Sequence, residues 1–265
     1  SPLKADQWPQ DSKKQGICPM RLYCRPLLGF KSGIKVHLAP YTESASMDEH
    51  RYSDLFEEAG VWYRDTHVVL DSGAHSDRYF NKSVLFLRPA LTRRVCLGLV
   101  TPFLHSEIEI VVGPELGGVY LSQYAAEHLA DINNREVLAM TAEKVGDPEK
   151  SFHFTRGLGH LLEGRRVLIT EDVLTSGDSV RRVMKAVEEN GGQVVGITAI
   201  CNRGGVVAEQ YGDNISLCSL MNVNPPTWKA TPDDPCPLCR DGVPINTTVG
   251  KGREYLEKNA AAQNG

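Results

Sequence analysis

Residues 165–180 read RRVLITEDVLTSGDSV, in which a short apolar run leads into two adjacent acids, a small polar turn and a helical pattern. The apolar run at 167–169 is typical of a parallel strand that is buried on both faces of a sheet. Glu171 and Asp172 lie just past that run, and two carboxylates at the end of a core strand are unfavourable unless they have partners. The order of these residues therefore predicts a bound ligand where the strand ends.

Strand and helix patterns alternate along most of the chain after residue 47. Strands or extended segments are expected at 66–73, 77–86, 107–113, 135–144, 164–172, 193–203 and 214–223, and helices at 48–60, 88–104, 117–130 and 179–192. Strands separated by helices predict an α/β fold with a mostly parallel central sheet and helices on both faces. In such sheets ligands bind beyond the carboxyl ends of the strands, where the two acids and the glycines of GPELGG, including Gly117, are expected.

The bulk properties fit one α/β domain in a reducing compartment. The chain has 265 residues, of which 41% are hydrophobic, and a formal net charge of -4 that gives no reason to expect nucleic-acid binding. No apolar run is long enough to cross a membrane, and the seven cysteines do not resemble a disulfide scaffold, so we expect a cytoplasmic protein. Residues 1–46 are expected to be an irregular extension and 47–265 the functional domain, with a core at about 105–223 and a carboxyl-terminal segment at 231–265.

The turn after the acids has the properties of a phosphate cradle. A turn that leads into a helix presents backbone N–H groups and the positive end of the helix dipole. Thr175, Ser176 and Ser179 add hydroxyl donors, and Gly177 lets the backbone approach a ligand closely. The acids would repel the phosphate itself, so they suit neighbouring sugar hydroxyls or Mg²⁺. Together these groups predict a site for a 5-phosphorylated ribose.

A purely structural strand–turn–helix is the alternative interpretation of the same stretch, because Asp and Ser residues are good helix caps. The turn alone would slightly favour that alternative, and the two acids that follow the apolar strand reverse the balance. The Walker pattern G-x-x-x-x-G-K-[ST] does not occur in the sequence, which argues against a nucleotide triphosphatase.

The stretch VLITEDVLTSGDSV resembles the phosphoribosyl-pyrophosphate (PRPP) signature of type I phosphoribosyltransferases. The resemblance implies their fold, a mostly parallel central sheet with helices on both faces and a small amino-terminal or hood subdomain. It also implies that Glu171 and Asp172 hold the ribose hydroxyls and that the loop 175–179 holds the 5-phosphate. Asp178 departs from the small residue common at its position, so it must point away from the phosphate or weaken its binding.

The segment LDSGAHSDRYFNK, residues 70–82, is similar to the amino-terminal segment of orotate phosphoribosyltransferases. The resemblance implies that Tyr79, Phe80 and Thr175 contact the base, and an aromatic pair is suited to stacking on a pyrimidine. A Tyr–Phe pair that packs in a core is the commoner outcome of such a pattern. Arg203, in ICNRGG, matches an arginine that holds the orotate carboxylate in that family, and its planar fork suits this role. A surface arginine in a turn is the alternative.

Two departures and one closer match refine the resemblance. Better-known members carry Tyr-Lys where this chain has Glu115 and Leu116, and a lysine where it has Asp71. A subgroup of bacterial orotate enzymes is more similar, with SGxHSDxYxxK, GPxxGG, RG after a short hairpin, and CPLCxxGxP near the carboxyl end. The resemblance runs from about residue 50 to the carboxyl end, and it implies a homodimer.

The implied reaction joins orotate to the ribose of PRPP, releases pyrophosphate and gives orotidine 5'-monophosphate, a step of pyrimidine synthesis. Negative charge builds on the leaving pyrophosphate, and the resemblance implies Mg²⁺ held by Asp172 and the pyrophosphate. Segment 141–157 is similar to the mobile loop of these enzymes and implies further cations there, with Lys144 and Arg156 favoured as catalytic residues. Lys82 and Gly117 are further PRPP-binding candidates.

The remaining residues of segment 141–157 leave several possibilities open. Lys150 and His153 add to the pyrophosphate-binding candidates, and a solvated run of charges is an equally good interpretation of Lys150. We name no general base, because N1 of orotate is acidic enough to make one unnecessary.

The motif CPLC places Cys236 and Cys239 at the spacing of half a zinc site. A complete site would need two more ligands, from Cys201, Cys218, a histidine or another subunit. A single CxxC is weak evidence, and simple packing or a reduced pair explains it at least as well.

Two rival functions remain open from the sequence. A phosphoribosyltransferase for a purine or for uracil is disfavoured, because a neutral base would gain little from Arg203. A PRPP-sensing regulator that has lost catalysis is kept open by the departures at Asp71 and Leu116. A simple discriminator is whether segment 140–157 can place cations over the pyrophosphate.

Overall fold

The computed structural model of the chain describes residues 49–146, 151–231 and 235–263. The chain divides into two units, 1–44 and 45–265, and every described residue belongs to the second. The predicted extension at 1–46 lies outside the described residues, so its boundary stays a prediction. Within the described part of the chain, no helix is both long and apolar enough to cross a membrane.

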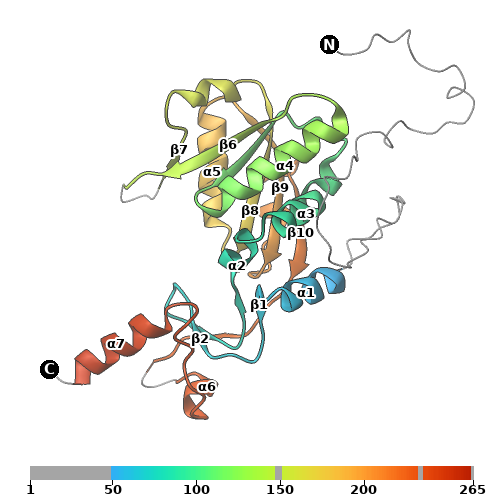
Figure 1. Ribbon diagram of the computed structural model, residues 1–265. Coiled ribbons are helices and arrows are strands. Elements are labelled where there is room, and N and C mark those ends of the chain that lie inside the picture. The colour runs from blue at the N-terminus through green and yellow to red at the C-terminus, as the bar shows by residue number, and fades with distance from the viewer. Residues whose placement is uncertain (1–48, 147–150, 232–234, 264–265) are drawn as a thin grey trace, which may run out of the picture. The chain divides into compact units, whose positions relative to one another are not determined.

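A six-stranded sheet forms the centre of the unit (Figure 1). Its strand order is β10-β9-β8-β5-β6-β7, and all neighbours pair in parallel except β6 and β7, which are antiparallel. Along the chain the strands are β5 (Ile110–Pro114), β6 (Leu138–Lys144), β7 (Phe152–His153), β8 (Arg166–Leu174), β9 (Gln193–Asn202) and β10 (Ser216–Asn222). The prediction of a mostly parallel α/β sheet is therefore confirmed.

Helices cover both faces of this sheet, as the sequence predicts. Successive residues of a strand point to opposite faces, and in β5 Ile110 and Val112 pack with α5, whereas Val111 packs with α4. The helices are α1 (Glu49–Glu58), α2 (Lys82–Phe86), α3 (Pro89–Val100), α4 (Gly117–Asn133), α5 (Asp178–Glu189), α6 (Pro237–Arg240) and α7 (Gly252–Gln263). Within the described residues, short 3₁₀ turns lie at Thr101–Phe103, Leu158–Leu162 and Ala208–Gln210.

Two small sheets form the hood, which carries one wall of the site described below. One pairs β1 (Trp62–Tyr63) with β4 (Tyr79–Phe80), and the other has the order β11-β3-β2, from Thr227–Trp228, His75–Ser76 and Val68–Val69. The hood is thus built from both ends of the described chain, and the carboxyl-terminal contribution was not predicted. The amide of Lys251 also donates to the carbonyl of Val69 at 2.7 Å, which ties the segment before α7 to β2.

Two boundaries predicted from the sequence are wrong. The extended segment expected at 77–86 ends at Phe80, and Lys82–Phe86 is helical. Strand β8 does not end at Asp172 as expected but runs on to Leu174, because its pairing with β9 continues to Asn202. Its pairing with β5 stops at Ile169, so the sheet is open on the β5 side where Glu171 and Asp172 lie.

Candidate active site

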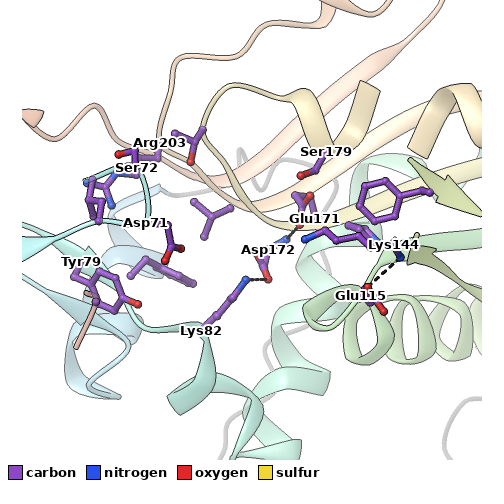
Figure 2. Close-up of a pocket in the computed structure, with 17 residues that line it drawn as sticks. Asp71, Ser72, Tyr79, Lys82, Glu115, Lys144, Glu171, Asp172, Ser179 and Arg203 are labelled. Carbon is purple, nitrogen blue, oxygen red and sulfur yellow. Dashed lines mark hydrogen bonds and ion pairs between the residues drawn. The ribbon is translucent and has the colours of Figure 1, made fainter. Parts of the chain in front are cut away.

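A cavity of about 410 Å³ lies beyond the carboxyl ends of four central strands (Figure 2). Pro114 ends β5, Lys144 ends β6, Glu171 and Asp172 lie near the end of β8, and Arg203 follows β9. Nine of the residues singled out from the sequence line this cavity: Tyr79, Phe80, Lys82, Lys144, Glu171, Asp172, Thr175, Ser179 and Arg203. The cavity therefore lies at the edge of the sheet where the sequence predicts a ligand.

The two acids are buried at the centre of the cavity wall. Glu171 is 7% and Asp172 is 5% exposed, and the backbone N–H of Asp172 donates to Oε1 of Glu171 at 2.9 Å. Burial raises the pKa of Glu171 to about 8, and the charge of Asp172 adds to the effect. Glu171 is thus poised to hold a proton near neutral pH until a ligand supplies better partners.

Lys82 is the direct counter-ion of Asp172. Its Nζ lies 2.8 Å from Oδ2 of Asp172 (Figure 2). Burial opposes the charge on Lys82, but the contact with Asp172 outweighs burial and raises the pKa of the lysine. The start of α4 approaches the same carboxylate so closely that a methyl group on Gly117 would overlap Oδ2 of Asp172. Gly117 therefore lies beside the acids, as a close approach of the GPELGG turn requires.

The loop between β8 and α5 encloses a smaller cavity of about 110 Å³ next to the acids. Gly177 has a φ of +76°, in the left-handed region that glycine adopts at little cost, and it precedes the first turn of α5. The lining residues include Thr175, Ser176, Gly177, Asp178 and Ser179. Backbone and hydroxyl donors thus surround a space at the positive end of a helix, which is the arrangement that binds a phosphate.

Asp178 is held by partners within the loop and its own helix. Its Oδ1 accepts a hydrogen bond from Nη1 of Arg181 at 2.6 Å, and its Oδ2 accepts one from Ser176 Oγ at 2.9 Å. These contacts lower the pKa of Asp178, chiefly through the Ser176 hydroxyl. Arg181 therefore balances the negative charge that the sequence places awkwardly close to a phosphate.

The hood side of the cavity carries the residues expected to bind a base. Tyr79 is half-buried and lines the cavity. Phe80 touches the cavity but is mostly in the core, since it is 5% exposed and its ring packs edge-on against Phe56 with centroids 5.4 Å apart. Phe80 is thus mainly a core aromatic residue, as the alternative interpretation expected. Tyr79 is the better candidate for stacking.

Arg203 is a buried cation that faces this cavity. It is 8% exposed, and its Nη2 donates to Oγ of Ser76 at 3.0 Å. Burial lowers its pKa, and among the described residues no carboxylate forms an ion pair with it. A buried guanidinium with one hydroxyl partner is well suited to an anionic ligand.

The predicted cations of segment 141–157 are only partly brought together. Lys144 lines the cavity, and its backbone N–H donates to Oε1 of Glu115 at 3.0 Å. Arg156 and His153 are exposed and are not among the residues that line the cavity, so the favoured catalytic role of Arg156 has no contact that supports it in this conformation. Lys150 lies outside the described residues.

Several residues of the cavity were not assigned a role from the sequence. Glu115, Asp71 and Ser72 line it. The resemblance expects a lysine at the position of Asp71 and a Tyr-Lys pair at the positions of Glu115 and Leu116. Gly250, from the segment before α7, lines it as well, and no local signal in the sequence pointed to this contact. Cys236 and Cys239 do not line the cavity; Cys236 is the N-cap of α6, and Cys239 lies within that helix.

Comparisons with known proteins agree with this geometry. Residues 103–234 match the family model of the phosphoribosyl transferase domain. The chain is 31% identical over 199 residues to an orotate phosphoribosyltransferase of Caldicellulosiruptor saccharolyticus, covering 75% of this chain and 95% of that protein. It is 34% identical over 192 residues to one of Thermus thermophilus, covering 72% and 96%.

Among solved structures, the orotate phosphoribosyltransferase of Mycobacterium tuberculosis in complex with Fe(III) dicitrate has the same fold. It matches with a TM-score of 0.51 and 20% identity over 66% of this chain and 96% of that one. The chain thus belongs to the orotate phosphoribosyltransferase family of pentosyltransferases.

Proposed function

We propose that this chain transfers ribose 5-phosphate from PRPP to N1 of orotate, giving orotidine 5'-monophosphate and pyrophosphate. One observation carries the proposal: a single cavity joins the buried acids and part of the loop 175–179 to the buried cation Arg203. The first set of groups suits a phosphorylated ribose, and the arginine suits the carboxylate of the base. The curated relatives that carry the name orotate phosphoribosyltransferase support the same assignment.

In the proposed complex, Glu171 and Asp172 accept hydrogen bonds from the ribose hydroxyls, and the loop 175–179 donates to the 5-phosphate. Asp172 and the pyrophosphate oxygens are the hard ligands that Mg²⁺ prefers, and the ion would supply positive charge to the leaving group. Lys82 Nζ, at 2.8 Å from Asp172, is near enough to exchange that carboxylate for a pyrophosphate oxygen.

The chemistry chiefly requires cations where negative charge develops. Breaking the bond to an anomeric carbon gives an oxocarbenium-like transition state, and the departing pyrophosphate gains charge. Lys144 and Lys82 line the cavity and are the cations that we assign to it. A catalytic role for Arg156 requires its segment to move toward the cavity, and closure of a loop over the active site would provide that movement.

An ultraviolet assay of orotate consumption tests the proposal. We expect absorbance loss that requires both PRPP and Mg²⁺ and that yields pyrophosphate. Adenine or uracil in place of orotate should give no product. No turnover with orotate, but tight PRPP binding in calorimetry, would instead identify a PRPP sensor or an enzyme for another base.

Replacing Arg203 tests the assignment of the base. We expect Arg203→Met to raise the KM for orotate about 10- to 100-fold, because a hydrogen bond to a charged group contributes about 1.5–3 kcal/mol. The Kd for PRPP should hardly change. Arg93→Met is the matched control, since Arg93 is on α3 and pairs with Glu127 on the surface. An unchanged KM for orotate would remove Arg203 from the base site.

Replacing Gly204 tests whether close packing of Gly204 against Thr175 holds the loop 175–179 in a binding conformation. A methyl group on Gly204 would overlap the carbonyl oxygen of Thr175, so Gly204→Ala must displace the start of the loop. We expect PRPP affinity to fall about 10- to 100-fold, as small misplacements of binding groups do. Calorimetric titration measures the loss, and an unchanged affinity would show that the loop adjusts freely. A thermal melt checks that the variant is folded.

The assembly and the compartment are further parts of the proposal. We propose a homodimer, which light scattering of the full chain tests directly. We also place the protein in a reducing, cytoplasmic setting, in which its thiols would stay reduced.

A further inference from the structure

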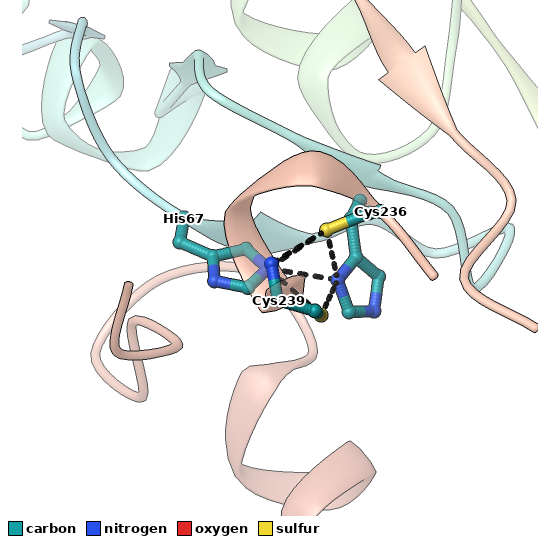
Figure 3. A group of neighbouring side chains, drawn as sticks. His67, Cys236 and Cys239 are labelled. Atoms are coloured by element: carbon teal, nitrogen blue, oxygen red, sulfur yellow. Dashed lines mark hydrogen bonds between the residues drawn. The ribbon is translucent and has the colours of Figure 1, made fainter. Parts of the chain in front are cut away.

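Four side chains with metal-binding atoms converge in the hood, outside the catalytic cavity (Figure 3). They are His67, which precedes β2, His75 in β3, and Cys236 and Cys239 at the start and near the end of α6. Their four ligand atoms all lie within 4.8 Å of one another, and three of the four residues are buried. The two cysteines of the CPLC motif therefore lie beside two histidines. Cys201 and Cys218, the other candidate ligands, are on β9 and β10.

The four sulfur–nitrogen distances within this cluster match a tetrahedral zinc site. Sγ of Cys236 lies 3.5 Å from Nε2 of His67 and 3.4 Å from Nδ1 of His75. For Sγ of Cys239 the same two distances are 3.6 and 3.4 Å. Ordinary zinc bond lengths place sulfur and nitrogen ligands about 3.5 Å apart in a tetrahedron. The two histidine nitrogens, at 2.8 Å, must separate by roughly 0.5 Å to reach the tetrahedral spacing.

The surrounding hydrogen bonds aim these atoms at a common point. Nδ1 of His67 lies 2.7 Å from the carbonyl oxygen of Val243. Because a carbonyl only accepts, Nδ1 carries the proton and leaves the Nε2 lone pair directed at the cluster. The backbone N–H of Cys239 donates to Sγ of Cys236 at 3.2 Å, as expected for a thiolate held by a CxxC turn. These contacts orient the ligands before any metal arrives.

Hydrogen bonding within the cluster leaves it poorly satisfied. With Nε2 of His67 as acceptor, Nδ1 of His75 and the two thiols would compete for one lone pair. One cation would instead engage one lone pair from each of the four side chains at once. Nε2 of His75, which has no hydrogen-bond partner among the described residues, would carry the proton of that ring when Nδ1 binds the metal.

We propose that His67, His75, Cys236 and Cys239 bind one Zn²⁺ ion as a structural site. Two thiolates and two imidazoles in a tetrahedron are the ligand set that zinc prefers, whereas Mg²⁺ and Ca²⁺ prefer oxygen. Four protein ligands leave no open coordination position, so the ion holds the fold and does not activate water. The site is separate from the proposed transfer reaction.

The site fastens the carboxyl-terminal segment to the hood. His67 precedes and His75 belongs to the β2–β3 hairpin, whose turn contains Asp71 and Ser72, and both turn residues line the catalytic cavity. Strand β11 pairs with β3 through Trp228 and His75. The ring of Tyr255, from α7, packs edge-on against His75 with centroids 4.9 Å apart. Zinc would therefore hold together the segments that carry the base side of the cavity.

Metal analysis of the purified full chain tests the proposal. We expect about one zinc per chain by plasma mass spectrometry after exhaustive dialysis. The double variant Cys236→Ser/Cys239→Ser should contain almost none and should melt at a temperature lower by on the order of 5–15 °C. Cys218→Ser, a half-buried thiol on β10, is the matched control and should keep its zinc.

Cobalt substitution keeps the test decisive if the double variant does not fold. Co²⁺ added to the metal-free chain should give the visible absorption of a tetrahedral ion and a thiolate charge-transfer band in the near ultraviolet. Three results would each overturn the proposal: no zinc uptake by the unaltered chain, zinc retained by the double variant, or a Cys236–Cys239 disulfide in the intact mass of the purified protein. A cobalt spectrum without the thiolate band would overturn it as well.

Discussion

The double variant Glu171→Gln/Asp172→Asn is expected to fold and to lose about 10²- to 10⁴-fold in kcat/KM for PRPP-dependent orotate consumption. Each carboxylate accepts hydrogen bonds that contribute about 1.5–3 kcal/mol when one partner is charged, and each 1.4 kcal/mol is tenfold. Both substitutions preserve side-chain size. In the unaltered chain Nζ of Lys82 lies 2.8 Å from the carboxylate of Asp172, and the amide oxygen of the variant can still accept a hydrogen bond from it. The ultraviolet assay gives the rate, and calorimetry gives the affinity for PRPP.

The chain offers a closely matched control for this variant. Glu188 and Glu189 are also adjacent acids, but they are exposed at the end of α5. Glu188→Gln/Glu189→Gln makes the same change in formal charge and should leave turnover unaltered. Retention of full turnover in the Glu171/Asp172 variant would mean that the two acids only cap and pack the end of β8.

The sequence predicted the centre of this site well, because its signals are local. The apolar run of β8, the turn and the helical spacing of α5 follow one another within residues 165–189, and no distant partner is needed to recognise them. The end of β8 was missed for the converse reason. Whether the strand stops at Asp172 or continues to Leu174 depends on β9, which keeps pairing after β5 has stopped.

The hood was hardly predictable, because its strands have only two residues each and show no periodicity. Strand β3 pairs with β11 across about 150 residues of chain. Local sequence patterns carry no information about such a pairing. A similar distance separates the two halves of the proposed metal site. His67 and Cys236 are 169 residues apart, and the sequence showed only the CPLC half, without saying which residues would complete it.

Arg203 and Phe80 show how burial decides between interpretations that a sequence leaves open. A turn arginine after β9 is often exposed, but Arg203 is 8% exposed and faces the cavity, which favours a ligand. Phe80 was assigned to the base by resemblance, yet it packs mostly against Phe56 and Trp62 in the core. Both outcomes depend on packing between segments that are far apart in the chain.

Glu171→Gln alone is expected to stabilise the ligand-free chain at alkaline pH. Burial raises the pKa of Glu171 to about 8 in the folded chain, against an ordinary value of 4.5. Between these values the unfolded chain gives up a proton that the folded chain retains, so stability falls as pH rises and the loss is complete above about 8. The penalty is on the order of 2–4 kcal/mol. In Mg²⁺-free buffer, the variant should melt at a temperature roughly 5 °C higher than the parent at pH 8.5.

The dependence on pH separates this explanation from a general effect of the substitution. At pH 4 the parent and Glu171→Gln should melt at nearly the same temperature, because Glu171 is protonated when folded and mostly protonated when unfolded. Glu188→Gln, at an exposed position, should show no such divergence. A constant difference between parent and variant at all pH values would mean that Glu171 is ionised in the free protein, with Lys82 and Lys144 as sufficient counter-ions. A difference in melting temperature that grows with pH, together with lost PRPP affinity, would show that Glu171 contributes to ligand binding and lowers the stability of the free protein.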